Sequence, residues 1–243
     1  MLRSNLCCSI GTGLVWRLIT IALSLAASCV AAQRKTVSPT PVIVVDPGHP
    51  SEVSSGAEVQ NGTTEVHTAW EVALHLQKLL RERGYVVVMT KSIETQMVRN
   101  VERAEIGNRS RAALMVRLHC DASSDSGYAV YHPDRQGTVE GRTGPSTDVM
   151  RRSTAAAESL HVAMALLLAG QLKDGGVRGD SKTLVGSRQG ALTGSIFSEI
   201  PVVLIEMVTL SNPHDARFIK SAAGKLLMAR AIADGVQRYV RAK

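Results

Sequence analysis

Residues 42–49 read VIVVDPGH, and this stretch decides the fold. Its first part, Val42–Val45, is a continuous apolar run of mostly β-branched residues, which is typical of a strand buried on both faces. A strand of that kind requires helices on both sides of its sheet. The run ends in the polar, turn-forming sequence DPGH, so chemically active side chains follow directly at its carboxyl end.

Helices and strands alternate beyond this run. Apolar residues recur at helical spacing between Val66 and Arg83, and Gly84 marks the end of that predicted helix. A second strand, a weaker helix and a third strand follow over Tyr85–Met89, Val98–Ala112 and Leu114–Leu118. This order indicates a parallel α/β unit.

The second half of the chain is less regular. A fourth strand is predicted over Gly127–Tyr131, and an irregular loop rich in glycine, proline and charged residues over His132–Thr147. A helix is predicted over Ser153–Leu172, and a polar glycine-bearing stretch without a predicted strand follows over Gly179–Gly194. A β-branched strand is then predicted over Pro201–Ile205, and a closing helix over Asp215–Val240. We expect residues 42–243 to form a single three-layer α/β domain with a mainly parallel sheet flanked by helices.

The first 32 residues have the pattern of a signal peptide. Two arginines precede the apolar run LITIALSLAA, and small residues before Gln33 suit a cleavage site. We expect a signal peptide over residues 1–32, a polar linker over residues 33–41, and no stable membrane span after cleavage. An uncleaved anchor and a lipid-modified Cys29 are open alternatives.

Cysteine content and charge agree with export to the periplasm or cell envelope. Cys120 is the one cysteine outside the leader, so the mature chain cannot form an internal disulfide. The leader holds two arginines and no acid, so the formal net charge falls from +7 to +5 on cleavage. A moderately basic exported chain suits an anionic cell-wall or membrane-surface partner. Nucleic acid is not an expected partner, because the chain has no long lysine or arginine cluster.

Polar residues follow three of the predicted buried strands. They are His49, His119 and Glu206. Because the carboxyl ends of parallel strands meet at one edge of a sheet, these side chains can share a site. Each also has a simpler alternative, since a histidine after a strand is often structural and a glutamate there is often solvated.

Glu65 stands at the predicted start of a helix, where its charge complements the exposed backbone N–H groups. Together with His49 and His119 it would form a tripod of two imidazoles and one carboxylate. Such a tripod binds zinc and leaves one position open for water. A structural zinc site has four protein ligands, usually including cysteines, so the ligand count favours a catalytic zinc.

Several motifs occur in a characteristic order: VIVVDPGH, SSGA, NGTTE, GYVVVMT, RAEIGN, VRLHCDA, GYAVYH and PVVLIEMVTLSN. Over residues 42–240 the chain resembles the zinc-dependent N-acetylmuramoyl-L-alanine amidases of the amidase 3 type. The resemblance implies that His49, Glu65 and His119 hold Zn²⁺ and that Glu206 is the catalytic glutamate. It implies peptidoglycan as the substrate, cut between N-acetylmuramic acid and the L-alanine of the stem peptide. A requirement for an activator protein is left open.

Two residues depart from the family pattern. Pro50 follows the first histidine where glycine is common, and Arg117 stands two residues before the second histidine where a small residue is common. These departures leave the loop shape and the substrate contacts open. Cys120, beside the second histidine, is expected to be a buried apolar residue.

Three further polar residues have expected supporting roles. Asp46 is expected to shape the turn before His49, and Asn212 to order the loop after the last strand. For His67, a surface position and a hydrogen bond to Glu65 are both open.

Two rival functions are also open. An exported zinc peptidase or other amidohydrolase would use the same tripod on a different substrate. A catalytically silent cell-wall-binding module would need neither an open zinc position nor a base, so the presence of Glu206 and all three predicted ligands argues against it.

Overall fold

The computed structural model describes Leu2 and residues 40–242, so nearly all of the predicted signal peptide and linker lies outside the described residues. None of the helices in the described part combines the length and hydropathy that a membrane span requires. The strands of this part are β1 (Val42–Pro47), β2 (Val86–Met89), β3 (Leu114–Asp121), β4 (Tyr128–His132), β5 (Gly137–Val139), β6 (Arg142–Gly144), β7 (Asp174–Gly179) and β8 (Val202–Thr209).

Six of these strands form one mixed sheet in the order β2–β1–β3–β8–β4–β7. The first four run parallel to one another, whereas β4 is antiparallel to β8 and parallel to β7. β5 and β6 form a separate hairpin. The expected α/β domain with a mainly parallel sheet is confirmed, although the reversed direction of β4 and β7 was not predicted.

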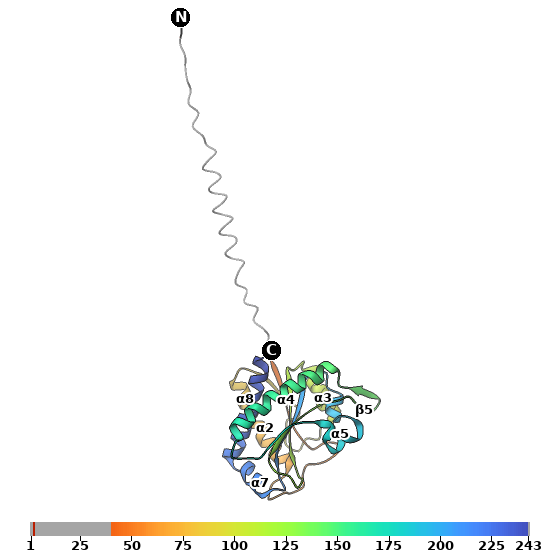
Figure 1. Ribbon diagram of the computed structural model, residues 1–243, viewed down its shortest axis with the longest axis vertical. Helices are drawn as coiled ribbons and strands as arrows, with labels where there is room; N and C mark the ends of the chain where they lie inside the picture. The colour runs from red at the N-terminus through yellow and green to blue at the C-terminus, as the bar shows by residue number, and fades with distance from the viewer. Residues whose placement is uncertain (1, 3–39, 243) are drawn as a thin grey trace. The chain divides into compact units, whose positions relative to one another are not determined.

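Helices cover both faces of the sheet and give three layers (Figure 1). α2, α4 and α8 pack together on one face, and α3 lies on the other, beside α6. The helix bounds are α2 (Glu65–Glu82), α3 (Asn100–Arg109), α4 (Thr147–Leu168), η1 (Asp180–Lys182), α5 (Leu184–Gln189), α6 (Thr193–Ile196), α7 (Pro213–Lys220) and α8 (Ala222–Arg241).

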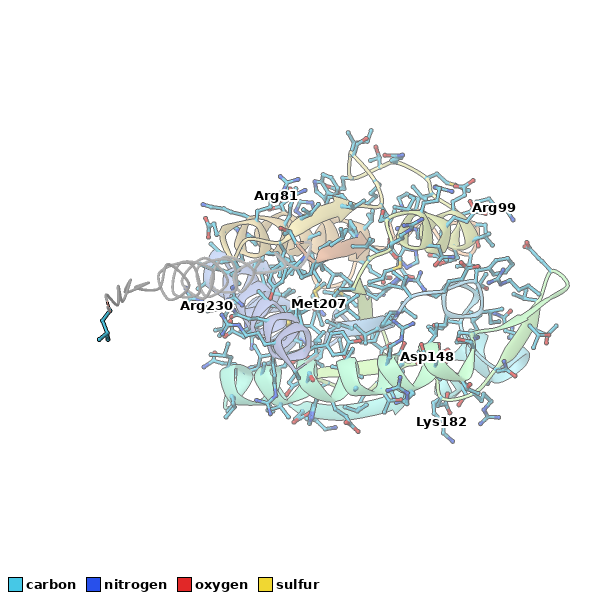
Figure 2. The ribbon with its side chains drawn as sticks, turned by 90° about the horizontal axis from the view of Figure 1, so that it is seen from above. Arg81, Arg99, Asp148, Lys182, Met207 and Arg230 are labelled. Atoms are coloured by element: carbon cyan, nitrogen blue, oxygen red, sulfur yellow. The ribbon has the colours of Figure 1, made fainter. Side chains whose placement is uncertain are left out.

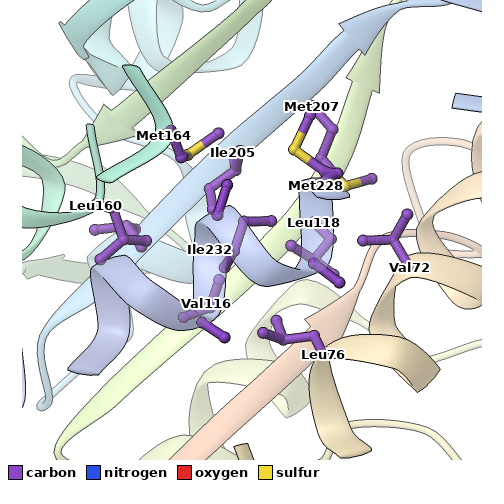
Figure 3. Close-up of a cluster of buried hydrophobic side chains, with 14 of the residues drawn as sticks. Val72, Leu76, Val116, Leu118, Leu160, Met164, Ile205, Met207, Met228 and Ile232 are labelled. Carbon is purple, nitrogen blue, oxygen red and sulfur yellow. The ribbon is translucent and has the colours of Figure 1, made fainter. Parts of the chain in front are cut away.

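The strands alternate their side chains between two cores, as the two-residue period of a strand requires. Val116 and Leu118 of β3 enter the large core under α2, α4 and α8, where Figure 3 shows them near Ile232 of α8 and in the same cluster as Leu160 of α4. Met115, which precedes Val116 and therefore points to the opposite face of the sheet, belongs to the smaller core on the α3 side. Both faces are therefore apolar, which explains the continuous hydrophobic runs in the sequence.

Charged side chains lie at the periphery of the molecule. Arg81, Arg99, Asp148 and Lys182 are exposed, and Figure 2 shows Arg81, Arg99 and Lys182 toward the outline of the view and Met207 near its centre. A charged group in the interior is therefore an exception that requires a partner, because an unpaired buried charge is costly.

Two helices differ from their predicted extents. α4 begins at Thr147 rather than Ser153, because the Ser146 hydroxyl accepts a hydrogen bond from a backbone N–H of the first turn. The predicted closing helix is divided at Ser221, whose extended backbone ends α7 and whose hydroxyl caps α8. Local capping bonds decide both boundaries.

Three strands were missed. The predicted irregular loop after β4 contains the β5–β6 hairpin, and β7 lies between α4 and the glycine-bearing stretch, which it overlaps at Gly179. β7 lies at the edge of the sheet and pairs with β4 alone, and no residue of it is fully buried. Its polar, glycine-rich sequence therefore lacks the hydrophobic alternation by which strands are predicted.

A buried ionic cluster lies beneath the carboxyl end of β1. Asp46 is fully buried, and its two carboxylate oxygens accept from Arg103 Nη1 (2.5 Å) and Arg117 Nε (2.9 Å). The Thr90 hydroxyl donates to the same carboxylate at 2.5 Å. Burial alone would raise the pKa of Asp46, but the two guanidinium groups hold it well below its usual range.

Arg103 connects this cluster to the turn that follows β1. It projects from α3 and is 1% exposed. Its guanidinium donates to the carbonyl oxygens of Pro47 (2.8 Å), Pro50 (2.9 Å) and Val98 (3.0 Å). The turn, α3 and β3 are thus held by one set of charge-assisted hydrogen bonds.

Substitution of Leu160 tests the large core. Leu160 is fully buried in α4, whereas Leu166 of the same helix is 76% exposed. We expect Leu160→Ala to lower the free energy of unfolding by about 2–5 kcal/mol, through lost burial and the cavity left behind. Leu166→Ala is the matched control and should change it by less than about 0.5 kcal/mol. Urea unfolding followed by circular dichroism measures both, and equal losses would contradict this assignment of the core.

The ionic cluster is tested by Asp46→Asn. Removal of this charge leaves two buried guanidinium groups without their shared partner. We expect the free energy of unfolding to fall by about 3–5 kcal/mol at pH 7. The carboxyl group of Asp46 has a pKa of about 3.9 in the unfolded protein and a lower pKa in the folded protein. The stabilisation by the ionised Asp46 is therefore present above pH 4 and declines as the pH falls below it. Unfolding of both proteins at several pH values should show their difference shrinking below pH 4, and a constant difference would be inconsistent with an ionised Asp46.

Candidate active site

The carboxyl ends of β1, β3 and β8 lie side by side and present polar groups on the α3 side of the sheet. His119 and Glu206 are register partners on the adjacent parallel strands β3 and β8. His119 lies four residues after Met115 on β3, and Glu206 lies four residues after Val202 on β8, so each points to the same face as that residue. Met115 and Val202 belong to the core on the α3 side. His119 and Glu206 therefore project from the same face of the sheet.

Glu65 reaches this edge from the start of α2. Thr64 caps the helix through a hydrogen bond from the backbone N–H of His67. The Glu65 carboxylate has one oxygen 3.2 Å from His49 Nε2 and the other 2.9 Å from His119 Nδ1. It also accepts from the backbone N–H of Cys120 at 3.1 Å. The structure thus brings together three residues that are far apart in sequence.

The three side chains form a compact cluster with metal-ligand chemistry. Each of His49, Glu65 and His119 offers one ligand atom, and these atoms lie within 4.8 Å of one another. The two imidazole rings are 5.1 Å apart and meet at 80°. Burial alone would raise the pKa of Glu65, but the hydrogen bonds from His119 and His49 hold it well below its usual range. The carboxylate is thus ionised at neutral pH, as a metal ligand must be.

The loop after β1 fixes the orientation of His49. The His49 backbone is left-handed (φ 52°), and its carbonyl accepts a hydrogen bond from the Lys91 ammonium. His49 Nδ1 donates to the carbonyl of Ser54 at 3.1 Å, which leaves Nε2 facing the cluster. A side chain at Gly48 would approach the His119 ring to 2.6 Å, so only glycine permits this packing.

Two polar atoms of the site are buried without a partner among the described residues. They are Nε2 of His119 and Oε2 of Glu206. Native structures rarely leave such atoms unsatisfied, and each requires an explanation such as a bound ion or water. In a tetrahedral zinc site with bonds of about 2.0–2.1 Å, neighbouring ligand atoms are separated by about 3.3 Å. The observed separations of 3.2 and 2.9 Å between Glu65 and the two imidazoles suit that arrangement.

The electrostatic environment of Glu206 differs from that of Glu65. Burial and the neighbouring carboxylates of Glu65 and Asp121 raise the pKa of Glu206 well above its usual range, and Arg117 opposes this shift. A carboxyl group with such a shift gains a proton readily, which suits an acid–base role.

A hollow of about 160 Å³ opens beside the cluster. Its lining includes His49, His119 and Glu206, together with Arg117 and Asn100. A larger hollow of about 500 Å³ lies between α2 and the segment after β2, but it contains none of the predicted site residues. The smaller hollow is therefore the candidate active site, since two residues of the cluster, His49 and His119, line it together with Glu206.

The other residues singled out in the sequence have structural roles. His67 lies 3.2 Å from Glu94, and no hydrogen bond joins it to Glu65 within the described residues. Asn212 caps α7 by accepting from two backbone N–H groups. Cys120 is buried and belongs to the large core, and burial raises its pKa.

Arg103 and Lys91 were missed in the sequence. Arg103 shares the inward side of α3 with Ala104 and Gly107, where a charged residue among small buried ones indicates a buried partner. Lys91 donates to the carbonyl of Glu94 at 2.8 Å as well as to the His49 loop, and burial lowers its pKa to about 8. It follows β2 with no pattern that distinguishes it from a surface lysine.

The chain is similar in sequence to characterised amidases. The chain is 25% identical over 220 residues to the N-acetylmuramoyl-L-alanine amidase AmiA of Escherichia coli strain K12, covering 82% of this chain and 75% of that protein. It is 28% identical over 225 residues to the N-acetylmuramoyl-L-alanine amidase AmiC of Neisseria meningitidis, covering 82% of this chain and 53% of that one.

Solved structures share the fold. The N-acetylmuramoyl-L-alanine amidase AmiC2 of Nostoc punctiforme superimposes with a TM-score of 0.67 at 22% identity, over 84% of this chain and 99% of that chain. The CwlD amidase from Clostridioides difficile, solved in complex with the GerS lipoprotein, superimposes with a TM-score of 0.65 at 19% identity. The match covers 84% of this chain and 100% of that chain. A family model described as N-acetylmuramoyl-L-alanine amidase matches residues 43–238, and the chain therefore belongs to the N-acetylmuramoyl-L-alanine amidase family.

Proposed function

We propose that this protein cleaves the amide between N-acetylmuramic acid and the L-alanine of the peptidoglycan stem peptide. Zinc is held by His49, Glu65 and His119, and Glu206 is the acid–base catalyst. The observation that most supports this is the convergence of the ligand cluster and Glu206 on one hollow. The family match distinguishes the proposal from a peptidase, and the presence of Glu206 distinguishes it from a silent binding module.

Zinc fits the donor set. Two imidazoles and one carboxylate are the ligands of catalytic zinc sites, which keep a fourth position open. Nδ1 of His49 donates to a backbone carbonyl, so Nε2 is the nitrogen that would bind a metal, after giving up the proton that it shares with Glu65. Zinc, when bound, lowers the pKa of a coordinated water to about 7 and polarises the substrate carbonyl.

Glu206 is positioned to move the proton. Pairing of β8 with β3 holds it beside His119, and burial excludes bulk water from its carboxyl group. A nearby divalent cation favours the ionised form, because its positive charge opposes the effect of burial on the pKa. The carboxylate then accepts a proton from the attacking water and delivers it to the leaving nitrogen of L-alanine.

The setting we propose is the cell envelope. Residues 1–32 are a signal peptide, residues 33–41 a linker and residues 42–243 the catalytic domain. The mature net charge of +5 suits an anionic cell-wall surface. Because CwlD was solved with a partner protein, an activator protein is included among the proposed partners, beside peptidoglycan.

Metal binding is tested independently of activity. We expect residues 33–243 to bind one zinc ion and to unfold at a higher temperature with zinc than without it. His119→Ala removes one of three protein ligands and should weaken zinc binding by at least about 100-fold. His67→Ala is the matched control, because His67 pairs with Glu94 outside the cluster. Calorimetric titration of the metal-free proteins measures their zinc affinities. Equal affinity for the wild type, His119→Ala and His67→Ala would rule out this ligand set.

Catalysis is tested on purified peptidoglycan. Zinc-loaded protein should release stem peptides with a new free L-alanine amino terminus, identified by mass spectrometry. Glu206→Gln keeps the shape but not the acid–base group, and should lower the rate by about 10²–10⁴-fold with zinc still bound. Chelator-treated protein should be inactive, and free stem peptide should not be cut. Cleavage of free peptide alone would favour the peptidase instead.

A further inference from the structure

We propose that Arg117 forms a carboxylate-binding subsite in the active-site hollow, and that this subsite takes the free α-carboxylate of the second residue of the stem peptide. The inference rests on the proposed amidase function and adds substrate specificity to it.

Arg117 has a terminal nitrogen that binds nothing within the described residues. Its Nε donates to Asp46 at 2.9 Å and its Nη2 to Asn100 Oδ1 at 2.6 Å, whereas Nη1 has no acceptor. Arg103 differs, because all three of its guanidinium nitrogens donate to acceptors in the protein. Of the two arginines that line the hollow, Arg117 is therefore the one with donors to spare.

The free nitrogen is held rigidly. Asp46 and Asn100 fix the plane of the Arg117 guanidinium, and the side chain is 4% exposed. A guanidinium whose orientation is set in advance loses little freedom when it binds a carboxylate, and the pairing is charge-assisted. The buried carboxylate of Asp180 is close enough for its charge to interact with that of Arg117, but no hydrogen bond joins them: Oδ2 accepts from the backbone N–H of Leu192, and Oδ1 has no partner among the described residues.

Gly194 of α6 packs closely against the Arg117 guanidinium. A β-carbon at this position would lie 2.6 Å from Arg117 Nη1 and 3.0 Å from Cζ. The neighbouring Thr193 lines the same hollow as Arg117. The absence of a side chain at residue 194 therefore lets the guanidinium keep its place beside the hollow.

The spacing matches the stem peptide. Arg117 and His119 lie two residues apart on one face of β3, so their α-carbons are separated by about 6.6 Å. In the substrate, the α-carbon of the second residue is about 3.8 Å from that of L-alanine, and its α-carboxylate extends beyond it. An amide bond placed at the cluster therefore brings that carboxylate, rather than one further along the stem, to the Arg117 end of the hollow.

The test uses two synthetic muropeptides that differ in one group. One has D-glutamate with a free α-carboxylate at the second position, and the other has D-isoglutamine, in which that group is an amide. We expect the zinc-loaded protein to show a kcat/KM at least about tenfold higher for the free acid, mainly through KM, because the contact is present before and during reaction.

Two variants separate recognition from folding. Arg117→Met removes the charge and should reduce the ratio of kcat/KM for the two muropeptides to less than about twofold, whatever the activity of this variant on each substrate alone. Gly194→Ala places a β-carbon 2.6 Å from Nη1 and displaces the guanidinium while its positive charge stays in the protein, and should reduce that ratio in the same way. Arg109→Met is the matched control, because Arg109 lies on the exposed side of α3 and pairs with Glu105, and it should keep the wild-type preference.

Equal kcat/KM for the two muropeptides in the wild type would overturn the subsite alone and leave the amidase function intact. Retention of the full preference in a folded Arg117→Met or Gly194→Ala protein would also overturn it. Absence of cleavage of both muropeptides by the zinc-loaded wild type would overturn the proposed function, and the subsite with it.

Discussion

The pairing of Asp46 with two buried arginines is the interaction on which the rest of the structure depends. Asp46 ends β1, Arg103 belongs to α3 and Arg117 to β3, so one carboxylate joins three elements at the edge where the site forms. The turn that carries His49 is held by the same guanidinium of Arg103, and His119 follows Arg117 by two residues. A buried ion pair adds little net stability, but loss of one partner is severe, so its role here is to specify one geometry.

The cluster above this pairing is arranged for a ligand that the protein itself does not supply. Glu65 satisfies one nitrogen of each imidazole, which keeps the three side chains together, yet His119 Nε2 and Glu206 Oε2 stay unsatisfied. Hydrogen bonds within the cluster offset part of the cost of burying these groups. Each of these two buried atoms costs free energy for as long as it has no hydrogen-bond partner or bound ligand.

The parts of the fold that could be predicted are those with a strong hydrophobic period. Val42–Val45, Leu114–Leu118 and Pro201–Ile205 are buried on both faces, so their sequences identify the strands and locate the polar residues that follow them. The direction of β4 and the existence of β7 could not be predicted, because both depend on pairing partners distant in sequence. Glu65 was identified through ligand chemistry, whereas Arg103 was missed because a buried charge is recognisable only beside its partner.

Arg117 shows how a structural residue can acquire a second role. Its Nε neutralises Asp46, a task that uses one edge of the guanidinium and fixes its plane. Nη1 is left without an acceptor among the described residues, beside Gly194 and in a side chain that lines the hollow. A lysine could satisfy Asp46 but could not also present a second, oriented donor, since its ammonium is a point charge. The fork of the guanidinium is therefore what allows a single residue to support the fold and to discriminate between substrates.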